Sequence, residues 1–156
     1  MYSRILKKIE SIMVKLTGLL FFCILCITVT NIVLRNVLGV SWLFMDGLLR
    51  LMFIWMVFLG SSILFYRNDH LIMNFFSDKF SDRAFVIVDM LQHVLFLLFM
   101  GILVYYGIHV TSIRMTIPFE TWDLPTGYAY MSVPVNAVIM ALFAVEKIIY
   151  LKESNK

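Results

Sequence analysis

The sequence predicts an all-α integral membrane protein with four spanning helices, and three observations support this prediction. Hydrophobic residues make up 62% of the chain, and its mean hydropathy is +0.91. Crossing a bilayer core takes about 20 apolar residues in a helix. The longest polar stretch, residues 66–83, is too short for a soluble domain, so we expect a single membrane domain over residues 1–156. Charged residues are absent from four long stretches: 16–34, 51–65, 90–113 and 124–145.

The positions of the basic residues predict how the chain is oriented. Lysine and arginine are enriched in cytoplasmic loops, so we expect both termini to lie in the cytoplasm. Ten of the thirteen basic residues fall in segments that four spans would place on this side: Arg4, Lys7, Lys8, Lys15, Arg67, Lys79, Arg83, Lys147, Lys152 and Lys156.

Residues 2–15 form an amphipathic pattern before the first span, which we expect over residues 16–34. Apolar side chains recur there at helical spacing, and Arg4, Lys7 and Lys15 fall on the opposite face. A basic amphipathic helix can lie in the headgroup region of a membrane. We therefore expect an interfacial helix, and the alternative is that this segment extends the first span into the cytoplasm.

A turn containing Gly39 and Ser41 precedes the second span, which we expect over residues 42–65. The polar stretch 66–83 follows as an inner loop. Apolar residues at helical spacing within it predict a short helix on the membrane surface. The third span is expected over residues 84–113.

Two prolines shape the prediction for the fourth span, which we expect over residues 124–146 after an outer loop at 115–123. Pro125 suits the first turn of a helix, where the N–H that proline lacks is not needed. Pro134 lies within the span and should bend it.

The second span carries the polar residues that most need an explanation. Asp46 and Arg50 are four residues apart with the acid first, the favourable order for an ion pair. Charges within a span usually mark a functional site or a partner. Three interpretations stay open: a contact between subunits, a self-contained ion pair, and transport chemistry. Trp55 and Gly60 follow, and the small residues after Gly60 would allow a close approach within the chain or against another protein.

Cysteine and histidine residues give little support for redox or metal chemistry. Cys23 and Cys26 form a C-x-x-C pattern, but they lie in the middle of a span and there is no second cysteine pair, so we interpret them as packing residues. His93 and His109 are about 24 Å apart along one helix and cannot bind the same iron. We expect no catalytic, substrate-binding or metal site, no cofactor, and no enzyme activity.

The second span with its flanks and the fourth span contain an ordered set of residues: Trp42, Asp46, Arg50, Trp55, Gly60, the run 67–74, the helix opening 124–128, and Pro134. This set resembles the small membrane subunit of tripartite ATP-independent periplasmic (TRAP) transporters. Length and four spans agree with that family, so the resemblance covers essentially the whole chain. One departure concerns an acidic residue that many relatives carry three positions before the arginine, where this chain has Gly47.

This resemblance implies a protein of the bacterial inner membrane without independent activity. It would pair with a large permease subunit that binds sodium and substrate. A soluble periplasmic binding protein would deliver an organic acid of the sialic acid or C4-dicarboxylate class. The small subunit would act as a scaffold, in contact with membrane lipid and with no nucleic acid. The alternative is a self-sufficient four-helix protein, either a quinone-linked thiol oxidase or a small exporter.

The resemblance also suggests roles for three groups of residues. Candidate docking contacts for the binding protein are Glu120, Trp122 and Asp123. Candidates for organising the inner loop are Arg67, Asp69 and His70. Candidate scaffold or interface residues are Asp46, Arg50, Trp55, Gly60, Pro125, Gly127 and Pro134.

Overall fold

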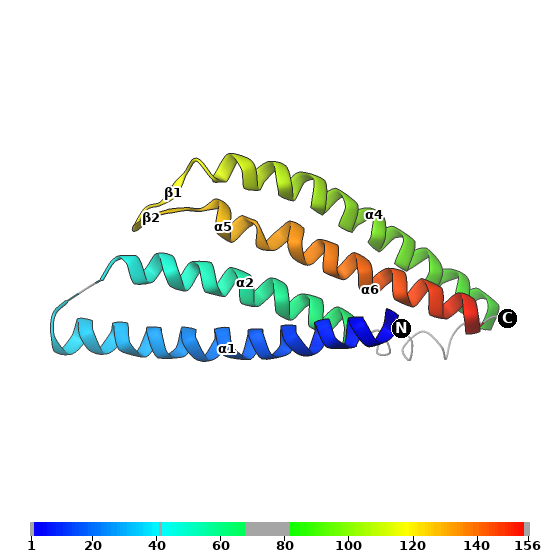
Figure 1. The fold of residues 1–156 in the computed structure, drawn as a ribbon, viewed down its shortest axis with the longest axis horizontal. Helices are drawn as coiled ribbons and strands as arrows, with labels where there is room; N and C mark the ends of the chain where they lie inside the picture. The colour runs from blue at the N-terminus through cyan, green and yellow to red at the C-terminus, as the bar shows by residue number, and fades with distance from the viewer. Residues whose placement is uncertain (1, 41, 68–81, 155–156) are drawn as a thin grey trace.

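A computed structural model describes residues 2–40, 42–67 and 82–154 (Figure 1). It confirms the all-α class, with four helices that are long and apolar enough to cross a membrane. The helix expected within the inner loop lies outside the described residues. The elements are α1 (Tyr2–Val37), α2 (Phe44–Arg67), α4 (Asp82–Arg114), β1 (Pro118–Phe119), β2 (Trp122–Pro125), α5 (Gly127–Tyr130) and α6 (Ser132–Ser154).

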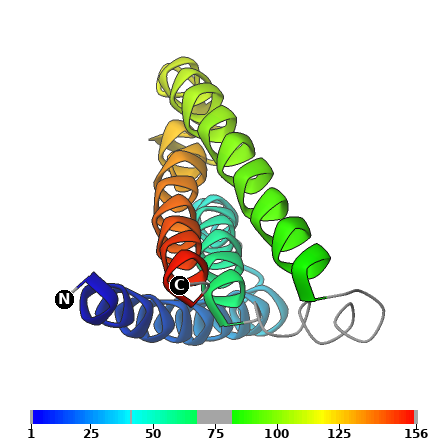
Figure 2. The same ribbon diagram turned by 90° about the vertical axis from the view of Figure 1, so that its right-hand side faces the viewer.

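The long helices pack as an open row in the order α1, α2, α6, α4 (Figures 1 and 2). Helix α1 packs mainly on α2, and α4 packs mainly on α6. The start of α1 and the end of α6 lie at one end of the molecule, and the β1–β2 hairpin lies at the other. We call these the termini end and the hairpin end.

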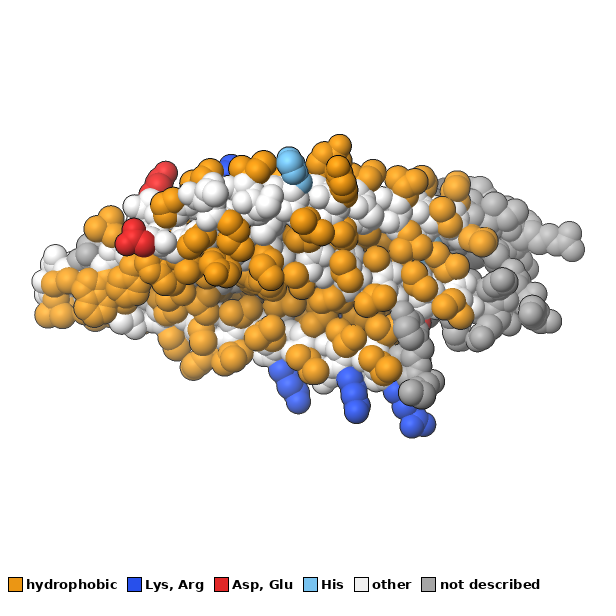
Figure 3. All heavy atoms as spheres, turned by 45° about the horizontal axis from the view of Figure 1, so that its top comes forward, with side chains coloured by type: hydrophobic (Ala, Val, Ile, Leu, Met, Phe, Trp, Pro, Cys, Tyr) orange, Lys and Arg blue, Asp and Glu red, His pale blue; other side chains and the backbone are white. Residues whose placement is uncertain are grey.

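A small apolar core joins α1, α2 and α6. Leu6 and Met13 of α1 pack with Leu59 and Ile63 of α2 and with Phe143 of α6, which is fully buried. Outside this core the spans are exposed: in the most apolar window of each, the buried share ranges from 6% in α1 and α4 to 33% in the fourth span. Hydrophobic side chains accordingly cover most of the face drawn in Figure 3.

The N-terminal segment differs from the expectation of a separate interfacial helix. Residues 2–15 continue without a break into the first span, so that α1 is a single helix of 36 residues. At about 1.5 Å per residue this is about 54 Å long, well beyond a bilayer core of about 30 Å. The physical reason is that Leu6 and Met13 are buried against α2 and α6, so the apolar face of the segment packs on protein.

Helix α1 ends in a turn that requires glycine. Gly39 has a φ of +66°, a left-handed conformation that other residues rarely adopt. The N–H of Val40 then donates to the carbonyl of Leu34 (3.3 Å), which satisfies a carbonyl at the helix end. The chain reverses here and α2 returns alongside α1.

The start of the fourth span also differs from the expectation. Residues 122–125 form β2, so Pro125 pairs with Pro118 in a hairpin and does not begin a helix. The helix begins at Gly127 and is interrupted at Met131, one turn before Pro134. Because proline lacks an N–H, it cannot donate to the carbonyl one turn earlier. Pro134 lies in the first turn of α6, within the candidate span Gly127–Ile149, and the interruption before it agrees with the bend expected from this proline.

Candidate functional site

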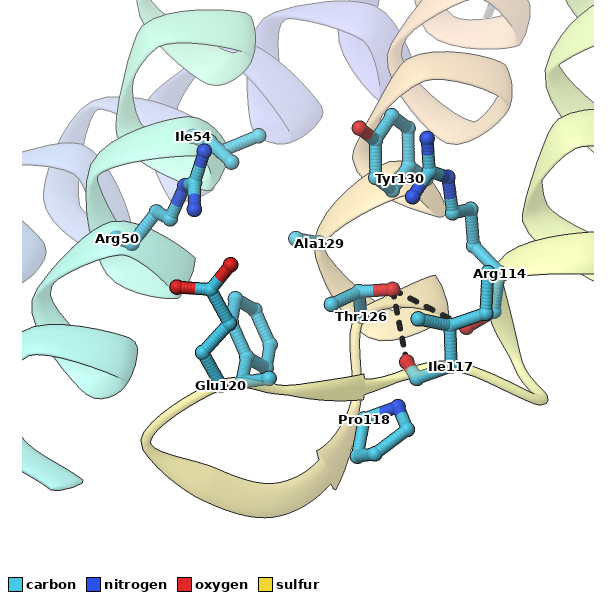
Figure 4. Close-up of a pocket in the computed structure, with 10 residues that line it drawn as sticks. Arg50, Ile54, Arg114, Ile117, Pro118, Glu120, Thr126, Ala129 and Tyr130 are labelled. Carbon is cyan, nitrogen blue, oxygen red and sulfur yellow. Dashed lines mark hydrogen bonds between the residues drawn. The ribbon is translucent and has the colours of Figure 1, made fainter.

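Polar side chains gather in a pocket at the hairpin end, where α2 begins and α4 ends. The pocket has a volume of about 360 Å³. Residues far apart in the sequence meet here, because the hairpin folds back over the space between α2 and α4 (Figure 4). The lining residues are Arg50, Ile54, Arg114, Ile117, Pro118, Phe119, Glu120, Thr126, Ala129 and Tyr130.

Two arginines and one glutamate give the pocket its charge. Arg50 extends from α2, and Arg114 is the last residue of α4. The guanidinium of Arg114 lies over the ring of Tyr130, 5.2 Å from its centroid, a cation–π contact. The carboxylate of Glu120 points toward Arg50 in Figure 4, but the two groups do not form an ion pair.

Thr126 fixes the backbone that surrounds the pocket. Its hydroxyl lies 2.9 Å from the carbonyl of Ile117 and 3.2 Å from that of Arg114, and its N–H donates to Ile117 (2.8 Å). Gly127 follows under Met115, where a Cβ atom would lie only 2.8 Å from Sδ and 2.9 Å from the backbone nitrogen. The end of α4 and the start of α5 are thereby held together without room for a larger residue at position 127.

Asp46 and Arg50 do not form the self-contained ion pair that was one of the open interpretations. An oxygen of Asp46 lies 3.5 Å from the side-chain nitrogen of Asn31 on α1. Arg50 turns instead into the pocket. The acid therefore faces α1 and the arginine faces the hairpin, although both are exposed and lie on the same helix.

The departure at Gly47 has a structural explanation. Gly47 is buried under the hairpin, and a Cβ atom at this position would lie 2.9 Å from the hydroxyl of Thr121 and 3.7 Å from the Cβ of Trp122. A larger side chain at this position would require the hydroxyl of Thr121 to move. The hairpin thus rests directly on the backbone of α2.

Trp55 and Gly60, both expected to be scaffold residues, differ in their surroundings. The indole nitrogen of Trp55 donates to the carbonyl of Tyr128 (3.0 Å) and so links α2 to α5. A Cβ atom added at Gly60 would meet nothing within 4 Å. Gly60 therefore has free space beside it, whereas Trp55 holds α2 and α5 together.

A buried polar network between α2 and α6 was not predicted from the sequence. The hydroxyl of Ser62 lies 3.1 Å from the side-chain oxygen of Asn136, whose nitrogen donates to the carbonyl of Ser132 (2.8 Å). All three residues are fully buried. The small-residue patch after Gly60 pointed to one side of this contact, but Asn136 was not singled out.

At the termini end, Arg67 pairs with a residue that the sequence analysis did not consider. Its Nη2 and Nε atoms lie 2.6 and 2.7 Å from one oxygen of Glu10 on α1. The other two expected inner-loop residues, Asp69 and His70, lie outside the described residues. The observed contact therefore joins the two helices α1 and α2.

We expect this ion pair to contribute little to stability, because the side chain of Arg67 is 58% exposed and such pairs are worth about 0–1 kcal/mol. Arg67→Gln should lower the melting temperature of the detergent-solubilised chain by about 1–4 °C. The exchange Glu10→Arg with Arg67→Glu should restore most of the loss. A reversed pair less stable than Arg67→Gln alone would contradict this assignment.

The expected docking residues lie on or beside the hairpin. Glu120 and Asp123 are exposed, and Trp122 is half-buried. Phe119 pairs with Trp122, which leaves Glu120 and its neighbour at the tip of the hairpin. The three residues are thus close in the hairpin, but Glu120 lines the pocket and the Cβ of Trp122 lies against α2 near Gly47.

The described residues contain no group of three or more His, Cys, Asp and Glu side chains that could hold a metal ion. Within α4, His93 is buried and His109 is exposed. Cys23 and Cys26 are free thiols on α1. The pocket at the hairpin end is therefore the site whose chemistry can be argued furthest, and its two guanidinium groups suit an anionic ligand.

Comparison with known proteins agrees with the pattern around the second span. The family model described as "Tripartite ATP-independent periplasmic transporters, DctQ component" matches residues 24–153. The chain is also similar to the sialic acid TRAP transporter small permease protein SiaQ of Vibrio cholerae serotype O1. The two are 26% identical over 148 residues, which cover 95% of this chain and 84% of that protein.

Proposed function

Since the chain belongs to the DctQ component family of the tripartite ATP-independent periplasmic transporters, we propose that it braces the large permease subunit as a scaffold and does not itself bind the substrate. As a member of this family it is a small permease subunit, a transporter component and not an enzyme.

The exposure of the spans is the observation that carries this proposal. The helices form an open row, and only 6% of the most apolar window is buried in each of α1 and α4. A self-contained carrier would enclose a polar pathway between its helices. Here the buried polar groups between α2 and α6 bond to each other, and the apolar flanks are left for lipid or a larger membrane protein.

The scaffold would serve a sodium-coupled importer of an organic acid. The relative in Vibrio cholerae is named for sialic acid, and we propose an acid of the sialic acid or C4-dicarboxylate class for this chain. A periplasmic binding protein would deliver it and contact the hairpin through Glu120, Trp122 and Asp123. Asp46 and Arg50 would stabilise the hairpin end of the scaffold.

We propose that both termini face the cytoplasm of a bacterial cell and that the hairpin end faces the periplasm. The excess of basic residues in and around the termini supports this orientation. It also places the three docking candidates on the side from which a periplasmic protein would approach.

The test is purification of the tagged chain from native membranes in mild detergent, followed by transport in liposomes. We expect a polytopic membrane protein to co-purify in roughly equal amount. The pair, together with a binding protein, should take up an organic acid only with an inward sodium gradient. The tagged chain alone should take up none.

Two results would overturn the proposal. One is recovery of the chain alone, folded and monodisperse, from native membranes. The other is uptake by liposomes that contain this chain and no second subunit. A Cys23→Ser/Cys26→Ser variant with full uptake would separately remove the thiol oxidase alternative.

A further inference from the structure

The pocket at the hairpin end carries positive charge that the chain does not neutralise. Arg50 has no ion pair within the described part of the chain, and Arg114 has a ring contact with Tyr130. The one carboxylate in the lining belongs to Glu120. Two arginines against one glutamate leave the pocket with a net charge of about +1 at neutral pH.

The geometry points to a binding site for a phosphate group, and we propose that this group belongs to the headgroup of an anionic phospholipid. Guanidinium groups bind phosphate through several parallel hydrogen bonds, and they lose less hydration than an ammonium group. Arg50 and Arg114 approach the pocket from opposite sides (Figure 4). A phosphate in the pocket would therefore be attracted by positive charge from both sides.

The position of the pocket along the helices suits a headgroup. Arg114 is the last residue of α4, and Arg50 lies less than two turns after the start of α2. Both therefore lie where membrane-spanning helices leave the hydrocarbon core. Basic pockets between spanning helices bind anionic lipid headgroups on the cytoplasmic side of membranes, and this pocket would offer the same kind of contact at the opposite end of the helices.

The surfaces next to the pocket suit the rest of a lipid molecule. Ile54, Ile117 and Pro118 line it with apolar atoms. Phe53 and Val57 follow Arg50 by three and seven residues, on the same face of α2. They are 54% and 45% exposed, so acyl chains can lie along this face.

The charge of Glu120 allows a test of whether the pocket binds an anion. Its carboxylate points into the mouth of the pocket beside Arg50 (Figure 4). A bound phosphate would be repelled by this charge. Removal of the charge should therefore strengthen binding, an effect that a misfolded variant would not produce.

The test is native mass spectrometry of the full-length chain in detergent, titrated with phosphatidylglycerol or phosphatidylcholine. We expect preferential binding of phosphatidylglycerol. Arg50→Gln and Arg114→Gln should each weaken it by about fivefold, since a basic residue contributes about 1 kcal/mol to such binding. Glu120→Gln should strengthen it. Arg35→Gln is the matched control: this exposed arginine lies in the last turn of α1 at the same end of the molecule and does not line the pocket.

A parallel titration with inorganic phosphate distinguishes a lipid headgroup from a free phosphate ion as the ligand of the pocket. Competition by phosphate at millimolar concentration, without preferential binding of phosphatidylglycerol, would overturn the lipid assignment in favour of a free anion. Equal binding of phosphatidylglycerol by the wild type and by the Arg50→Gln/Arg114→Gln variant would overturn the site itself. If those variants lose a co-purifying membrane protein while lipid binding is unchanged, the pocket serves a protein carboxylate and the lipid proposal is wrong. None of these readouts depends on transport, so failure here leaves the scaffold proposal intact.

Discussion

Gly107→Val should lower the melting temperature of the detergent-solubilised chain by about 4–8 °C, which corresponds to roughly 1–3 kcal/mol for overpacking a tight contact. Gly107 is the point where α4 crosses α6. A Cβ atom there would lie 3.0 Å from Cδ of Pro134 and 3.3 Å from its nitrogen. The proline ring is rigid and its nitrogen belongs to the backbone, so neither can move away without shifting α6.

Gly101→Val is the matched control, because Gly101 lies on the same helix with nothing within 4 Å of an added Cβ atom. The intrinsic change in helix propensity when valine replaces glycine is the same at both positions. Only Gly107→Val should separate α4 from α6. Equal melting temperatures for the two variants would show that this close contact does not stabilise the chain.

Asn136→Ala should have the second large effect, a loss of about 1–3 kcal/mol, because it removes two hydrogen bonds of a fully buried side chain, each worth about 0.5–1.5 kcal/mol. Asn136 is fully buried and connects Ser62 of α2 to the carbonyl of Ser132 on α6. We expect a lower melting temperature and earlier loss of helix in a denaturant titration followed by circular dichroism. Asn31→Ala is the control, since Asn31 is not buried and has a single long contact of 3.5 Å to Asp46.

A double-mutant cycle with Ser62→Ala isolates the contact between the two side chains. Hydrogen bonds between helices in membrane proteins contribute on average about 0.6 kcal/mol and at most about 1.7 kcal/mol. We expect a coupling energy in this range between Ser62→Ala and Asn136→Ala. Strict additivity of the two variants would mean that Asn136 acts through its volume and not through this hydrogen bond.

Most of the fold class followed from the sequence because each span can be recognised by itself. The thickness of the bilayer sets the length of an apolar stretch, and no knowledge of its neighbours is needed. The turn at Gly39 was also recognisable, because its glycine meets a local backbone requirement.

Local signals misled where packing against another segment decides the structure. The amphipathic pattern of residues 2–15 is compatible with packing on a membrane surface and with packing on other helices. Because Leu6 and Met13 are buried, the segment packs on other helices. Pro125 is compatible with the first turn of a helix and with the edge of a hairpin. In the structure it pairs with Pro118 and belongs to the hairpin. In each case the sequence was compatible with both outcomes.

The sequence by itself determined that this chain is a four-helix membrane protein, where its charges fall along the chain, and which family it resembles. Only the tertiary structure decided the order of the helices in the row and turned Arg50 away from Asp46 into a pocket with Arg114 and Glu120. It also decided the pairing of Ser62 with Asn136, 74 residues apart, and of Arg67 with Glu10, 57 residues apart. The physical reason is that transfer into a bilayer depends on the composition of one segment, whereas lateral packing depends on how closely two segments approach.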